Sequence, residues 1–154
     1  MSIVDGFAFE PMVGDPDDHR PASEWAVVVD PGGPAGRVDN LAVILEHIGP
    51  GDRIPAHIHA VDEVILPDGP GRFRIGDEIQ RVAPGAVVFI PAGAVHGLEN
   101  DGAEPLPIRA VFPATKVWLR YVERNPAPGT EADAPAPPLT FDLRTGQVSM
   151  DEDT

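Results

Sequence analysis

The chain contains no cysteine. Disulfide bridges and thiolate metal sites are therefore excluded, and any bound metal must be held by nitrogen and oxygen ligands. The sequence also lacks an apolar run close to the ~20 residues that a membrane-spanning helix needs. The opening residues, MSIVDGFAFEPMVGD, carry an acidic residue at position 5 and no basic region, so they do not resemble a secretory signal. Together these absences predict a cytoplasmic location.

Basic residues are scarce: 11 lysines and arginines stand against 25 aspartates and glutamates, and the formal net charge is −14. A surface of this kind repels phosphate backbones and anionic lipid, so we expect neither a nucleic-acid partner nor a membrane partner. The charge favours solubility, and a local site within it can still be positive. With 154 residues, of which 42% are hydrophobic, the chain is long enough for one domain with a buried core.

A sustained 3.6-residue apolar period, the mark of an amphipathic helix, is also missing. The chain instead alternates short runs rich in Val, Ile and Phe with turn signals that draw on 16 glycines and 19 prolines. These runs predict strands over residues 24–30, 41–48, 63–66, 71–76, 86–91, 107–113 and 117–123. Many short strands joined by Gly/Pro turns favour a sandwich or barrel, with a jelly roll among the options. We therefore predict an all-β fold.

Two regions differ from this pattern. Residues 1–22 are polar and contain proline, which predicts an N-terminal arm with little regular structure. Residues 124–154 open with a Pro- and Ala-rich stretch and form an acidic tail, for which we expect an extended, polyproline-like conformation. Within the tail, LTFDLRTG (139–146) can dock as one more strand on its own sheet or on a partner's, and the final SMDEDT is expected to fray. The barrel itself is predicted over residues 23–123.

The stretch PAHIHAVDE (55–63) is the first candidate site. His57 and His59 are one residue apart, so on a strand both imidazoles lie on the same face. Glu63 follows four residues later, on that face or across a bend. Such a group can close on one divalent cation, although two histidines on a strand are equally often a solvated surface feature.

A third imidazole comes from GAVVFIPAGAVHGLEN (85–100). Here an apolar strand runs into Pro91, a turn follows at Gly93, and His96 begins the next strand. Gly93 permits a turn that branched residues cannot make, and Pro91 stiffens the approach to it. His96 therefore reaches the sheet from a part of the chain distant from His57 and His59.

These two stretches resemble the paired signature motifs of the cupin superfamily. Residues 51–63 read G-x5-H-x-H-x3-E, and residues 85–100 read G-x5-P-x-G-x2-H-x3-N. The resemblance covers roughly residues 40–122 and implies a small single-domain bacterial cupin with a jelly-roll β-barrel, also called a double-stranded β-helix. It further implies a metal held by His57, His59, Glu63 and His96. With this donor set we expect one divalent transition metal per chain, Fe(II) before Mn, Ni, Co, Cu or Zn.

The chain departs from the family pattern after Glu63. The first motif usually continues through six residues to a glycine, but here only VILPD separates Glu63 from Gly69, and Pro67 interrupts the strand. This shortening leaves Asp62 as an alternative carboxylate ligand. Glu63 is preferred because its spacing from His59 fits the motif.

Other polar residues have two interpretations each. His47 lies in an apolar strand, which predicts a hydrogen-bonded interior histidine or, less simply, a residue facing the substrate. Arg53 and Arg109 can bind a substrate carboxylate or pair with a neighbouring acid. Asn100 matches a motif position and is expected to be a structural residue at a strand end.

The strand aromatics are core residues first, and some must also line a ligand cavity. The residues expected in the core are Leu45, Phe73, Phe89, Phe112 and Trp118. As possible acid–base groups the chain offers Glu46, Glu99 and Tyr121, and none has a position in the sequence that singles it out.

The function predicted from these residues is a metal-dependent enzyme acting on a small, anionic molecule. The first hypothesis is a mononuclear non-haem dioxygenase acting on a small organic acid, enediol or phenol. The second is a non-redox lyase, isomerase or epimerase in which the metal steadies an enolate. The third is a small-molecule-binding cupin without catalysis, against which an intact tetrad argues, because four buried polar groups are costly unless metal satisfies them. We also expect a homodimer, paired through edge strands or the N-terminal arm.

Overall fold

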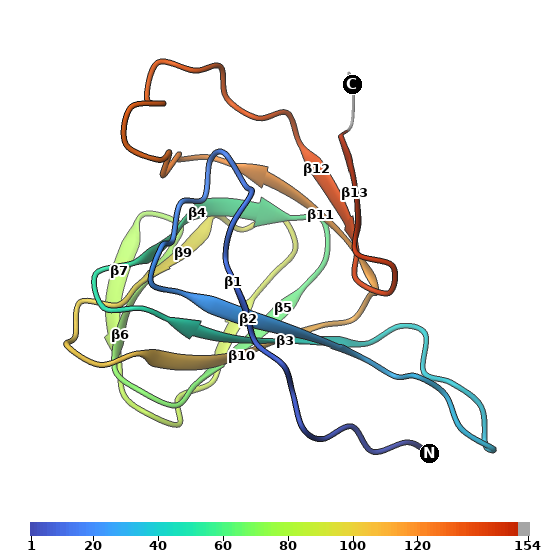
Figure 1. Cartoon of the computed structure of the whole chain (residues 1–154). Helices are drawn as coiled ribbons and strands as arrows, with labels where there is room; N and C mark the ends of the chain where they lie inside the picture. Colours follow the sequence, from blue (N-terminus) through green and yellow to red (C-terminus); the bar gives the residue numbers. More distant parts are fainter. Residues whose placement is uncertain (151–154) are drawn as a thin grey trace.

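The computed structural model describes residues 1–150, which form two antiparallel sheets and contain no helix (Figure 1). The first sheet has the order β1 (Glu10–Pro11), β2 (Glu24–Val29), β3 (Ala42–Ile48), β10 (Leu106–Phe112), β5 (Glu63–Pro67) and β8 (Val88–Ile90). The second has the order β13 (Gln147–Met150), β12 (Leu139–Asp142), β11 (Lys116–Tyr121), β4 (Arg53–His59), β9 (His96–Glu99), β6 (Gly71–Ile75) and β7 (Glu78–Val82). The predicted all-β fold is confirmed.

Neighbouring strands come from distant parts of the chain, as a jelly roll requires. β3 pairs with β10, β11 pairs with β4, and β4 pairs with β9. The last of these pairings brings the two histidine-containing stretches of the sequence side by side. Chain segments almost forty residues apart thus share one inner surface.

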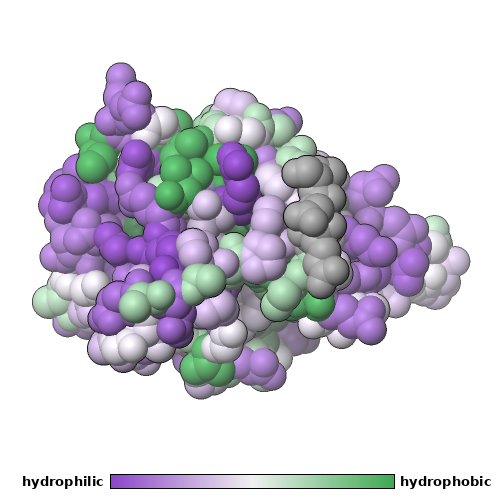
Figure 2. All heavy atoms as spheres, turned by 90° about the horizontal axis from the view of Figure 1, so that it is seen from above, coloured by the Kyte–Doolittle hydropathy of each residue, from purple (hydrophilic) through white to green (hydrophobic). Residues whose placement is uncertain are grey.

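The core lies between the two sheets and follows from strand alternation. In β10 the inward positions are Leu106, Ile108, Ala110 and Phe112, which are 1–3% exposed, whereas the positions between them are half-buried or exposed. Side chains of a strand point alternately to its two faces, so one face of each sheet can be apolar while the other meets solvent. On the face of the molecule seen in Figure 2, hydrophilic residues predominate and hydrophobic ones form small, separate patches.

Two of the expected core aromatics do not lie in the core. Phe89 is 72% exposed, because its neighbours Val88 and Ile90 occupy the inward positions of β8. Trp118 points outward from β11 and is half-buried. Phe73 and Phe112 are buried as predicted, and Leu45 is half-buried on the outer side of β3. These strands carry apolar residues on both faces, so the sequence did not show which side chains the pleat turns outward.

The arm and the tail contact each other across one end of the barrel. Asp17 is fully buried and accepts hydrogen bonds from Nε of Arg124 at 2.5 Å and from the backbone N–H of Ala136 at 2.7 Å. The Asn125 side chain donates to the carbonyl of His19 at 2.7 Å. The arm therefore has few strands but many fixed contacts. The boundaries at residues 22/23 and 123/124 remain predictions.

The tail extends the second sheet. β12 pairs with β11, so the stretch that begins at Leu139 docks on its own sheet. A further strand, β13, pairs with β12 and includes Ser149 and Met150, for which fraying was the wrong expectation. The remaining residues of SMDEDT, 151–154, lie outside the described residues. β7 and β13 were not anticipated because both are exposed edge strands with few apolar side chains.

Candidate metal centre

Four buried polar side chains converge inside the barrel from three strands. His57 and His59 lie on the inner face of β4, His96 begins β9, and Glu63 begins β5 on the opposite sheet. They are between 2% and 7% exposed. The structure thus brings together all four residues that the sequence motifs singled out.

The local backbone explains why they meet. His57 and His96 are direct partners across β4 and β9, after an irregularity in the register between Ile54 and His57. The turn before His96 contains Gly93 at φ 79°, in the left-handed region that favours glycine. The N–H of Gly93 donates to the carbonyl of His59 at 2.8 Å, which ties this turn to the end of β4. Turn and strand together place the His96 ring beside that of His57, with centroids 4.2 Å apart.

Each imidazole is oriented by a backbone carbonyl at its Nδ1 atom. His57 Nδ1 lies 2.8 Å from the carbonyl of Pro55, and His96 Nδ1 lies 2.9 Å from that of Ala94. His59 Nδ1 lies 3.2 Å from the carbonyl of Trp118. A carbonyl only accepts, so each Nδ1 carries the proton, and in the neutral ring Nε2 is left with a lone pair.

These lone pairs face one another and a carboxylate. His57 Nε2 and His59 Nε2 are 3.1 Å apart, and His96 Nε2 lies 2.9 Å from Oε2 of Glu63. One ligand atom from each of the four residues lies within 4.8 Å of all the others. Between two Nε2 atoms that both lack a proton, the contact is repulsive unless a cation lies between them. The donor set, three imidazole nitrogens and one carboxylate oxygen, suits a divalent transition metal.

Burial favours the neutral form of His57 and of His59. Desolvation, with the neighbouring His96 and His59, lowers the pKa of His57 well below its ordinary value. Burial also lowers the pKa of His59, although the Glu63 carboxylate acts in the opposite direction. Neutral rings are the form in which Nε2 can bind a metal. The four side chains can therefore hold a metal ion.

The alternative carboxylate, Asp62, has a different position. Its Oδ1 accepts a hydrogen bond from the backbone N–H of Ala92 at 2.8 Å, so it stabilises the turn that precedes β9. The carboxylate that lies among the three histidines is that of Glu63. The shortened segment before Gly69 has therefore not displaced Glu63 from the inner face.

The two arginines proposed for substrate binding do not reach this cluster. Arg109 lies on the outer face of β10 and pairs with both oxygens of Asp68, at 2.6 and 2.7 Å. Arg53 is exposed and donates to Oδ1 of Asn125 at 3.2 Å. Arg109 thus pairs with a neighbouring acid, the second of its two interpretations.

His47 also lies outside the cluster, and the expectation of an interior histidine was wrong. Its ring stacks on Phe9 with centroids 4.2 Å apart, and its Nδ1 lies 2.7 Å from Oε1 of Glu24. Its side chain is 37% exposed. The flanking residues Glu46 and Ile48 take the inward positions of β3, so the pleat turns His47 outward.

Sequence reasoning missed a second buried polar cluster, formed by Asp18, Arg20 and Glu46. Arg20 donates to both oxygens of Asp18, at 2.9 and 2.7 Å, and from Nη1 to Oε2 of Glu46 at 2.5 Å. Burial raises the pKa of Asp18 to about 6, although Arg20 acts in the opposite direction. The segment DDHR in the arm carried no periodic signal that could have placed these residues inside a barrel.

Of the three acid–base candidates, Glu46 and Tyr121 face inward and Glu99 faces outward. Tyr121 is the strand partner of His57, with ring centroids 6.3 Å apart, and its hydroxyl donates to Oδ2 of Asp15 at 2.6 Å. Burial and the nearby acids raise the pKa of Tyr121. Glu99 accepts from Arg72 at 3.1 Å on the outer face. All three groups are thus engaged by other side chains.

Comparison with known proteins identifies the class. The family model described as "Cupin domain" matches residues 44–112, a span that includes all four residues of the cluster. Residues 44–112 therefore form a cupin domain, and the resemblance inferred from the two motifs is confirmed. No curated protein is significantly similar to this chain in sequence. Residues 1–150 contain no helix of the length and apolarity needed to cross a membrane.

Solved structures with the same fold perform different reactions. The polyketide cyclase RemF from Streptomyces resistomycificus superposes with a TM-score of 0.67 at 21% identity, over 88% of this chain and 94% of its own. A cupin-superfamily sugar phosphate isomerase from Silicibacter pomeroyi gives 0.58 at 16%, over 86% and 78%. Salicylate 1,2-dioxygenase from Pseudoaminobacter salicylatoxidans gives 0.53 at 14%, over 60% of this chain but 25% of its own. At these identities the likeness establishes the jelly-roll fold alone.

Proposed function

We propose that this protein is a metal-dependent cupin enzyme in which His57, His59, Glu63 and His96 hold one divalent transition metal, with Fe(II) favoured. The observation that carries the proposal is the convergence of three Nε2 lone pairs and one carboxylate oxygen within 4.8 Å. Carbonyl partners at every Nδ1 fix the ring orientations before any metal arrives. Such outer partners are a regular feature of histidine metal sites.

A metal bound there would carry a net charge of about +1 with its four ligands and would supply a Lewis acid with positions open to two further oxygen donors. The barrel residues around it restrict water. The Phe112 ring lies 5.1 Å from that of His59, and Leu119, 7% exposed, is the strand partner of His59. A small molecule with two adjacent oxygens, in particular an anionic one, fits this environment.

For the reaction we propose a mononuclear non-haem dioxygenase that acts on a small organic acid, enediol or phenol. Acid–base catalysis by the chain would need a side chain free to exchange protons with the substrate. The available candidates are held elsewhere: Glu46 by Arg20, Glu99 by Arg72, and Tyr121 by Asp15. The dioxygenase reaction does not depend on such a side chain, because the substrate binds the metal through its own oxygens.

The second candidate is a non-redox lyase, isomerase or epimerase. One observation favours it: Tyr121 lies on the inner face beside His57, where a change of partner would direct its hydroxyl toward a bound molecule. The third candidate, a binding protein without catalysis, requires a metal that is structural or absent. Because the solved structures with this fold include a cyclase, an isomerase and a dioxygenase, they are compatible with both proposed reactions.

The decisive experiment is anaerobic purification, metal analysis and reconstitution with Fe(II), followed by oxygen-uptake measurements against catechols, enediols and hydroxybenzoates. Uptake that requires Fe(II) is the expected result, and His57→Ala should abolish it. Turnover of a substrate without oxygen would support the non-redox reaction instead. No turnover with any divalent metal would overturn both enzymatic proposals.

We also propose a homodimer in a cytoplasmic setting. The arm exposes large apolar side chains, among them Ile3 at 83% and Phe7 at 42%, which a second copy could cover. Size-exclusion chromatography with light scattering should give twice the chain mass, and a monomer at micromolar concentration would remove this proposal.

A further inference from the structure

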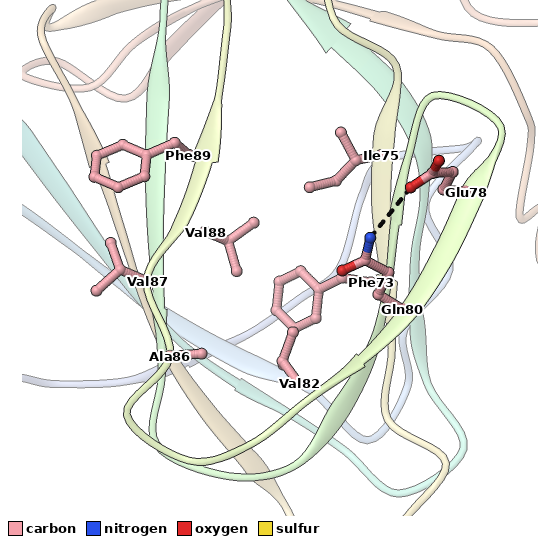
Figure 3. A pocket seen from close by; sticks show the side chains of 9 residues that line it. All are labelled: Phe73, Ile75, Glu78, Gln80, Val82, Ala86, Val87, Val88 and Phe89. Atoms are coloured by element: carbon pink, nitrogen blue, oxygen red, sulfur yellow. Dashed lines mark hydrogen bonds between the residues drawn. The ribbon is translucent and has the colours of Figure 1, made fainter.

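The barrel wall is open along one seam. β8 is the edge strand of the first sheet and β7 is the edge strand of the second, and each pairs with a single neighbour. A cleft lies between these two edges (Figure 3). Among residues 1–150 no ladder of hydrogen bonds joins β7 to β8, so the side chains along these two edges decide what can enter the cleft.

The floor of the cleft is apolar. Phe73 and Ile75 reach it from β6, Val82 from β7, and Val88 from β8. In Figure 3 Phe73 and Val88 point toward each other across the gap, whereas Phe89 points away from it. Ile75 is 39% exposed, so apolar surface is accessible within the cleft. Burying such surface against a ligand is favourable in proportion to its area.

The cleft adjoins the candidate metal centre through strand pairing. Ile75 is the direct partner of His96, and Ile90, two residues beyond Val88, is the direct partner of Glu63. Directly paired residues of an antiparallel ladder point to the same face of the sheet. The cleft wall and two of the four polar residues thus share one continuous inner surface.

One side of the cleft is polar. Glu78 and Gln80 of β7 are exposed and joined by a hydrogen bond of 3.2 Å from Nε2 of Gln80 to Oε2 of Glu78. The Glu78 carboxylate repels an anionic group and accepts a hydrogen bond from a hydroxyl group. The part of a ligand that lies here is therefore neutral, mainly apolar and tolerant of hydroxyl substituents.

We propose that the cleft between β7 and β8 binds the ring system of an aromatic substrate whose two adjacent oxygens reach the metal centre. This inference rests on the proposed function and narrows it: among enediols, small acids and phenols, it selects phenolic compounds with more than one ring. The chelating head carries the negative charge, and the remaining rings lie against Phe73, Ile75 and Val88.

The test compares catechol with 2,3-dihydroxynaphthalene, which has the same pair of hydroxyls and one more ring. Protein loaded with Fe(III) is titrated with each ligand, and Kd is read from the phenolate-to-Fe(III) absorbance band. We expect the two-ring ligand to bind roughly tenfold tighter or better, because its second ring leaves water. Gln80→Trp places an indole in the cleft from an exposed position and should reduce this preference to about twofold.

Ile79→Trp is the matched control, because Ile79 lies on the same strand, is 59% exposed and points to the outer face. It should keep the full two-ring preference. Equal affinities in the native protein, or a preference that survives Gln80→Trp, would overturn the inference while leaving the metal site intact. Failure of metal uptake or of catechol binding would instead defeat the proposed function, and the inference with it.

Light scattering on the same two variants tests a second copy as the occupant of the cleft. If Gln80→Trp converts a dimer to a monomer and leaves the two-ring preference unchanged, the cleft is an interface between copies and the proposal is wrong. If the oligomeric state is unaffected and the preference is lost, the small-molecule assignment is supported.

Discussion

Two clusters of buried polar side chains lie inside the same barrel, and they differ in how their charges are compensated. In the first, the Arg20 guanidinium is held between the carboxylates of Asp18 and Glu46, with donors opposite acceptors throughout. In the second, three imidazole lone pairs and the Glu63 carboxylate face one another without a cation among the side chains. The first cluster is complete by itself, whereas the second has the donors that a metal ion would complete.

The difference shows why burial of polar groups alone does not identify a functional site. An ion cluster with matched donors ties the arm to β3 and contributes mainly to the fold. A cluster made only of electron-pair donors is unfavourable unless something positive binds there. The same contrast leads to opposite responses to mutation, pH and metal.

The largest effect is expected from Arg20→Ala. It leaves two carboxylates buried without their partner, so the free energy of unfolding should fall by about 3–5 kcal/mol. Urea unfolding monitored by circular dichroism measures this loss. Arg109→Ala breaks an exposed pair with Asp68 and is the control, with an expected loss of about 0–1 kcal/mol. Similar losses in the two variants would show that the Arg20 cluster is not the stabilising one.

The next effect is a pH dependence that arises from Asp18. Its pKa is raised to about 6 in the folded protein from 3.8 in the reference state. The folded state therefore holds a proton that the unfolded state releases, and stability falls as pH rises from about 4 to about 6, by up to about 3 kcal/mol. Unfolding curves across this range should show the decline in the native protein, and Asp18→Asn should lack that component. An unchanged pH slope in Asp18→Asn would contradict it.

The next prediction concerns the metal affinity of the histidine cluster, for which we expect a loss of similar size. His96→Ala removes one of four ligand atoms, and affinity for Ni²⁺ or Fe²⁺ should fall by at least about a hundredfold, since losing an outer-shell partner alone costs 10–100-fold. Competition with a chromogenic chelator measures it. His47→Ala is the control and should bind metal as the native protein does. Retention of full affinity in His96→Ala would remove His96 from the site.

The smallest effect is expected at Asp62, and it tests which of the two adjacent carboxylates, Asp62 or Glu63, binds the metal. Asp62→Asn keeps an acceptor for the Ala92 N–H, so metal affinity should stay within about twofold of the native value, whereas Glu63→Gln should reduce it strongly. Metal content after dialysis, measured by mass spectrometry, distinguishes them. The reverse ranking would make Asp62 the ligand.

Much of the fold and the heart of the candidate site were predictable because they depend on local spacing. His57 and His59 share a face through the two-residue period of a strand, and Gly93 marks the turn that returns the chain to His96. The positions of His47 and Phe89 were predicted wrongly for the complementary reason. Each lies in an apolar run whose two faces cannot be told apart by composition, and only pairing with neighbouring strands decided which face is buried.

Residue type and spacing settled the all-β class and the absence of thiolate ligands, whereas the set of four converging side chains was implied by the resemblance to the paired cupin motifs. Long-range pairing decided the rest: that Arg20 enters the barrel, that Arg53 and Arg109 remain outside, and that β7 and β8 leave a cleft beside His96 and Glu63. Register between distant strands is set by the packing of the whole core, which no short stretch of sequence contains.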